Sequence, residues 1–180
     1  NLNNHNDNDT YHIFIKGWRR ALPFYTDNND VAIKGDFNAY HKITITASET
    51  QNALEELNKT INNLDDNETK VFVSEYVHNN PESVIAPYLT YKYKWAFNLS
   101  ELKELKNIIK QNNNSGYYGK LTEYIKLLER TDVGQNYMDF TLDNVDGKPV
   151  TLSSIINNNK RIMIDFWASW CPDCRVENPN

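Results

Sequence analysis

The segment IDFWASWCPDC, residues 164–174, carries the clearest structural signal in this chain. It joins an apolar run, residues 161–167, to the chain's two cysteines, Cys171 and Cys174. A continuous apolar run of this length predicts a central β-strand that is covered on both faces. A Cys-x-x-Cys pair directly after such a strand predicts a strand-to-helix turn that brings two thiols within disulfide reach.

This cysteine pair is the one group of residues with an evident reaction. A helix N-terminus favours the thiolate of Cys171, which makes that residue the nucleophile, and Cys174 can then resolve the mixed disulfide. Half of a zinc site is one alternative, but the histidines lack ligand spacing. A purely structural disulfide is the other, although so short a loop would constrain the unfolded chain little. The redox interpretation is favoured over both alternatives. The histidines that lack the spacing of zinc ligands are His5, His12, His41 and His78.

Three neighbours of the pair are candidate site residues. Asp165 lies inside the apolar run, where burial would raise its pKa and let it accept the proton of Cys174. An acid at a strand end with a solvent or backbone partner is an equally good interpretation. Trp170 offers an apolar platform for a partner polypeptide or simply packs. Pro172 is grouped with Trp170 as a candidate substrate contact.

The amino-acid composition argues against two classes of protein, nucleic-acid-binding proteins and membrane-spanning proteins. The 180 residues carry 19 Lys plus Arg against 24 Asp plus Glu, a net charge of −5. This charge argues against nucleic-acid binding. No apolar run approaches the roughly 20 residues of a membrane-spanning helix. A share of 39% apolar residues suffices for a core. We expect residues 1–10 to form a solvated tether, and they do not have the pattern of a signal peptide. We expect no cofactor or metal ion.

The rest of the chain predicts an α+β protein. Short β-branched runs at 11–15, 31–34 and 43–46 indicate a small antiparallel sheet. Helices are expected from a capping box at Ser48 and Gln51, over 68–78, from Pro81 with a kink at Pro87, from Ser100, and over 117–128. Strands at 140–142 and 150–152 flank a turn at Asp146-Gly147. We place a domain boundary near Val133.

One further motif is ambiguous. Residues 92–95, Lys-Tyr-Lys-Trp, alternate basic and aromatic side chains. They could form a ligand-facing strip, or a helix face along which lysine side chains lie on apolar surface.

Residues 164–174, with Arg175 and 177–179, resemble the active-site strand, turn and helix of thioredoxin-like proteins. Together with Gly134, 139–142 and 146–152 they resemble the TlpA/ResA-like branch, also labelled AhpC/TSA or redoxin, of bacterial cell-envelope thiol–disulfide oxidoreductases. The resemblance implies that Cys171 attacks, that Cys174 resolves, and that Asp165 is the buried acid. Pro172-Asp173 stands where Gly-Pro is commoner, and the charge of Asp173 opposes thiolate formation.

The family's domain continues beyond this helix with further strands, helices and a cis-proline loop, so we expect residues 133–180 to be its N-terminal portion. Residues 11–132 resemble, more loosely, the domain of unknown function that precedes such domains in envelope proteins of Gram-negative anaerobes. The expected organisation is a tether at 1–10, a β-sheet plus helical domain at 11–132, and a partial thioredoxin-like α/β domain at 133–180.

The expected function is a periplasmic or cell-envelope oxidoreductase that reduces protein disulfides and is recharged by a thiol electron donor. The alternative is a binding or homodimerisation module, residues 11–132, attached to an inactive redox domain. A peroxidase ranks lower, because Ala168-Ser169-Trp170 before Cys171 departs from T-x-x-C. A membrane tether would require a signal or lipid ahead of Asn1.

Overall fold

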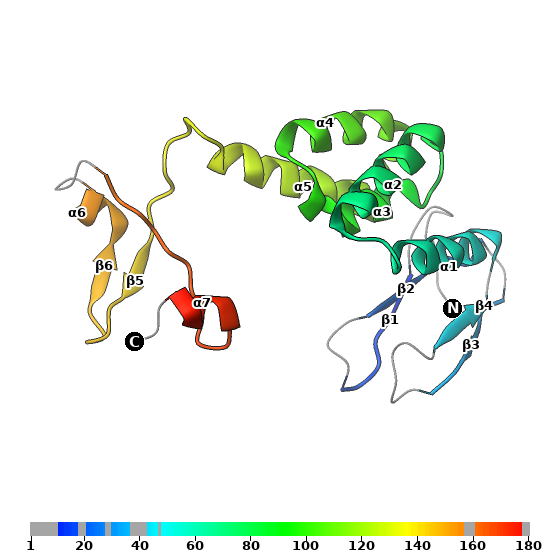
Figure 1. Ribbon diagram of the computed structural model, residues 1–180, viewed down its shortest axis with the longest axis horizontal. Coiled ribbons are helices and arrows are strands. Elements are labelled where there is room, and N and C mark those ends of the chain that lie inside the picture. The colour runs from blue at the N-terminus through cyan, green and yellow to red at the C-terminus, as the bar shows by residue number, and fades with distance from the viewer. Residues whose placement is uncertain are drawn as a thin grey trace. The chain divides into compact units, whose positions relative to one another are not determined.

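The computed structural model describes residues 11–17, 21–27, 30–36, 43–46, 48–156 and 161–177. Its elements are helices and two-stranded antiparallel sheets, which confirms the α+β class. The chain divides into two compact units, residues 1–133 and 134–180 (Figure 1). The tether expected at residues 1–10 lies outside the described residues.

The N-terminal unit begins with two separate β-ribbons where one sheet was expected. β1 (Tyr11–Ile13) pairs antiparallel with β2 (Leu22–Phe24), and β3 (Ala32–Lys34) pairs antiparallel with β4 (Thr44–Thr46). β2 was not predicted, because its central residue is Pro23, and proline is confined to edge positions in sheets. Leu22, Phe24 and Ile45 form a small buried cluster on these ribbons.

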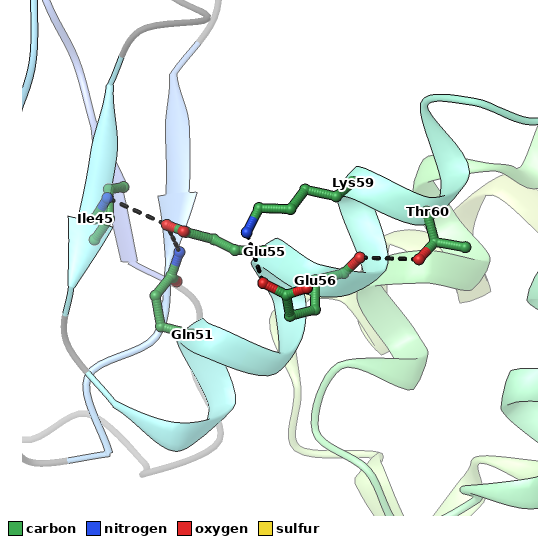
Figure 2. A network of polar contacts seen from close by, with 6 residues as sticks. All are labelled: Ile45, Gln51, Glu55, Glu56, Lys59 and Thr60. Carbon is green, nitrogen blue, oxygen red and sulfur yellow. Dashed lines mark hydrogen bonds and ion pairs between the residues drawn. The ribbon is translucent and has the colours of Figure 1, made fainter.

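Helix α1 (Glu49–Ile61) is tied to the ribbons by side-chain hydrogen bonds (Figure 2). Its N-cap is Ser48, as predicted, whose Oγ accepts from the backbone N–H of Gln51 at 3.1 Å. The Gln51 side chain does not complete a capping box but accepts from the backbone N–H of Tyr25 at 3.0 Å. Glu55 Oε1 accepts from the backbone N–H of Ile45 at 3.2 Å. These contacts provide hydrogen-bond acceptors for the backbone N–H groups of Tyr25 and Ile45.

The predicted middle helices are present, with one correction. α2 is Asp66–Asn79, α3 Ala86–Lys92, α4 Leu99–Ile108 and α5 Gly116–Thr131, with 3-10 turns η2 (Lys94–Ala96) and η3 (Lys110–Asn112). The helix expected from Pro81 begins only at Ala86, so Pro87 lies in its first turn and does not kink it. Proline is favoured there, because the first N–H groups of a helix have no intrahelical partner.

The core of this unit is formed mainly by α1 to α5. Its fully buried members include Leu89 on α3, Leu102 on α4 and Leu121 on α5. The stripe predicted for the last helix is confirmed, since Tyr117, Leu121 and Ile125 are buried on α5. His12 of β1 also contacts this core, since its Nε2 lies 2.9 Å from the Tyr117 hydroxyl.

Tyr117 gives an alkaline stability test. Burial, and secondarily the neighbouring Tyr91, raises the pKa of Tyr117 from 10.0 to about 12. The folded state therefore holds this proton more tightly than the unfolded chain does. Its contribution to stability is present below about pH 10 and lost as the pH rises to about 12. In a spectrophotometric titration, Tyr117→Phe should remove the latest tyrosinate absorbance step, and an unchanged curve would contradict the assignment.

The C-terminal unit contains the predicted hairpin but not the predicted central strand. β5 (Thr141–Asp143) pairs with β6 (Pro149–Thr151) around Gly147, and α6 (Leu152–Ile156) and α7 (Pro172–Glu177) follow. The strand expected at 161–167 is wrong, because these residues form no strand. A central strand needs a neighbour on each edge, and β5 and β6 pair only with each other among the described residues. Met163 and Phe166 are consequently 91% and 81% exposed.

Candidate active site

The two cysteines are joined by a disulfide at the start of α7. The Cα atoms of Cys171 and Cys174 lie 5.3 Å apart, within the usual disulfide range. Cys171 directly precedes the helix, and its backbone N–H donates to the carbonyl of Ala168 at 3.0 Å, which closes the turn before it. Its own carbonyl accepts from the backbone N–H of Arg175 at 3.1 Å. The predicted cysteine-bearing turn and helix are thus present.

One backbone group favours the first cysteine as nucleophile. The N–H of Cys174 donates to Cys171 Sγ at 3.3 Å, the contact that a residue at the start of a helix makes with the first turn. In the reduced protein the same N–H would stabilise negative charge on that sulfur. Both cysteines are half-buried, so they remain within reach of a partner.

An open hollow of about 350 Å³ lies beside the pair, lined by Trp170, Pro172, Arg175 and Val176. Trp170 is 84% exposed and Val176 is 80% exposed. The structure thus brings Trp170 and Pro172 together next to Cys171. Arg175 and Val176 were not singled out from the sequence, although helical spacing places Val176 one turn after Pro172 and could have found it.

Asp165 is the exception among the predicted site residues. It lies in the irregular segment before Cys171, and its side chain is exposed. The expected burial is therefore wrong in this structure. The reason is the missing strand, because burial at position 165 depended on a sheet around residues 161–167.

The described residues contain no group of three or more His, Cys, Asp or Glu side chains that could hold a metal ion. Within the same ranges, no helix combines the length and apolar character needed to cross a membrane.

Comparisons with known proteins agree with this geometry. Residues 133–180 match the family model described as AhpC/TSA family. The thioredoxin-like protein YneN of Bacillus subtilis is 37% identical over 46 residues, which is 26% of this chain and 26% of that protein. A thioredoxin of Pyropia yezoensis is 52% identical over 25 residues, 14% of this chain and 23% of its own length.

These matches cover a limited part of each protein. The chain spans about a quarter of the length of the two curated relatives. No solved structure gives a significant match. The family model, the two relatives and the helix-capping cysteine pair nevertheless agree on one class. Residues 133–180 of this chain are similar to the redoxins of the thioredoxin family.

Proposed function

We propose that the protein is a thiol–disulfide oxidoreductase of the TlpA/ResA-like kind, which reduces disulfides in other proteins through Cys171 and Cys174. The observation that carries the proposal is the disulfide at the start of α7, with the N–H of Cys174 directed at Cys171 Sγ. The exposed indole of Trp170 supports a polypeptide substrate, because aromatic side chains beside a reactive group provide apolar contact area.

The reaction begins from the dithiol form. The Cys171 thiolate attacks one sulfur of the substrate disulfide, forms a mixed disulfide and expels the first substrate thiolate, which takes up a proton. Cys174 then loses its proton and attacks Cys171 Sγ. The Cys171–Cys174 bond forms, the mixed disulfide breaks, and the second substrate thiol leaves. The substrate gains two electrons and two protons, and the protein is left in the disulfide form described here.

Two further parts of the proposal concern proton transfer and reduction of the pair. Asp165, six residues before Cys171, is proposed to accept the proton of Cys174, directly or through water. A thiol donor must return two electrons to the oxidised pair after each cycle. We place this cycle in the periplasm or cell envelope, where disulfides in substrate proteins persist.

A redox titration tests the proposal. The full chain is equilibrated in a glutathione or dithiothreitol series, and free thiols are labelled and separated on a gel. We expect one cooperative two-electron transition within roughly −270 to −120 mV, the range of thioredoxin-like proteins. A reducing role predicts a potential near the lower limit. A pair that stays oxidised throughout the series, or that titrates as two independent thiols, would contradict an oxidoreductase cycle.

A further inference from the structure

The N-terminal unit contains a polar pocket that lies apart from the cysteines in the sequence and has no role in the reaction above. It measures about 380 Å³, within the range of small-molecule sites. Residues of β2, β4, α1 and α3 line it. Leu22, Ile45 and Leu54 contribute apolar wall, whereas Glu55, Asn58 and Lys92 contribute polar atoms.

Lys92 is a cation that has no counter-charge within the described ranges. Its Nζ donates to Asn58 Oδ1 at 2.8 Å and lies 5.5 Å and 4.9 Å from the ring centroids of Tyr88 and Tyr93. Among the described residues, no carboxylate lies within ion-pair distance of it. Burial lowers the pKa of Lys92, so its charged form is destabilised here. An anion in the pocket would offset that cost.

Glu55 is the opposite charge in the same pocket. Its Oε1 accepts from the backbone N–H of Ile45 at 3.2 Å and from Gln51 Nε2 at 3.3 Å (Figure 2). These two donors hold the carboxylate in place. Lys59 also lines the pocket; it makes its ion pair with Glu56 at 2.6 Å (Figure 2), and its pKa is raised mainly by Glu56 and to a smaller extent by Glu55. Within the described ranges Glu55 forms no ion pair, with Lys92 or with another cation.

The pocket thus presents two ammonium groups, of which Lys59 is ion-paired with Glu56, and the Glu55 carboxylate, which makes no ion pair with Lys92, next to an apolar wall. A ligand that matches all three features carries a carboxylate, an ammonium group and an apolar body. We propose that this pocket binds a free α-amino acid with an apolar side chain. The ligand carboxylate binds Lys92 and Asn58 Nδ2, its ammonium group faces Glu55, and its side chain contacts Leu22, Ile45 and Leu54.

Titration calorimetry with the full chain tests this inference. The probes are L-leucine and L-phenylalanine, together with N-acetyl-L-phenylalanine, which lacks the ammonium group, and L-phenylalaninamide, which lacks the carboxylate. We expect saturable binding of at least one free amino acid. Each blocked analogue should bind at least about tenfold more weakly than phenylalanine, because each leaves one pocket charge unpaired.

Three variants locate the site. Lys92→Met keeps the apolar stem and removes the charge, and it should weaken amino-acid binding at least about tenfold. Lys94→Met is the matched control, because Lys94 also lies over tyrosine rings, at 4.2 Å from Tyr91 and 5.2 Å from Tyr124, but does not line the pocket. Its affinity should be unchanged. Glu55→Gln retains an acceptor for Ile45 and should weaken free amino acids while leaving the N-acetyl analogue unchanged.

Helical circular dichroism of each variant separates loss of binding from loss of fold. The inference is overturned if neither amino acid shows saturable binding to the unaltered chain. It is also overturned if the blocked analogues bind as well as phenylalanine does, or if Lys94→Met weakens binding as much as Lys92→Met does.

Discussion

Replacing Cys174 with serine is expected to trap the mixed disulfide between Cys171 and its substrate. The variant retains the backbone N–H of residue 174, whose nitrogen lies 3.3 Å from Cys171 Sγ in the native chain and which, in the proposed mechanism, would stabilise the attacking thiolate. It lacks the thiol that closes the internal bond, so the intermediate cannot resolve. After reduction, desalting and exposure to glutathione disulfide, mass spectrometry should find one glutathione on each chain.

The Cys171→Ser variant is the matched control for this trap. It leaves Cys174, in the first turn of α7, as the one remaining thiol of the chain. The backbone N–H of Cys174 then has no Sγ at position 171 to which it can donate. We expect no glutathione adduct over the interval in which Cys174→Ser is fully modified. Equal modification of both variants would show that the attacking thiol has been misassigned.

The features that the sequence predicted correctly depend on contacts between residues close together in the chain. Ser48 caps α1 through the N–H of Gln51, three residues away, and such a bond can be read from residue types alone. The cysteine-bearing turn is equally local, because the N–H of Cys171 bonds to the carbonyl of Ala168. The hairpin around Gly147, which has a φ of 72°, follows from turn chemistry.

The incorrect predictions depend on contacts with distant residues. Residues 161–167 have the composition of a central strand, but a strand exists only where neighbouring strands satisfy its backbone groups. The burial of Asp165 was inferred from the same absent sheet. The pocket of the N-terminal unit was not predicted either, since it needs Leu22, Glu55 and Lys92 to converge from separate elements.

The strip at residues 92–95 shows how the structure separates two interpretations that spacing left open. Lys92 lines the pocket, whereas Lys94 lies over Tyr91 and Tyr124 and does not line it. Tyr93 is buried and Trp95 is 55% exposed. The four residues therefore do not form one continuous ligand-facing surface. Lys92 is the residue proposed to bind a ligand, whereas the Lys94 side chain lies on aromatic surface.

The largest expected loss of stability follows from Leu121→Ala on α5. Leu121 is fully buried, at 0% exposure, in the core shared with Leu89 and Leu102. Truncation to alanine removes buried apolar contact and leaves a cavity, at an expected cost of about 2–5 kcal/mol in the free energy of unfolding. Urea unfolding followed by helical circular dichroism measures this cost, because the helices that pack around Leu121 provide most of the signal.

Leu127→Ala on the same helix provides the matched control. Leu127 is 48% exposed, so the substitution removes the same atoms from a position that buries about half as much surface. Both variants change the helix propensity of α5 identically, so their difference isolates the burial at position 121. We expect Leu127→Ala to cost about 1 kcal/mol or less. Equal losses from the two variants would mean that α5 does not pack with Leu121 toward the core and Leu127 toward solvent.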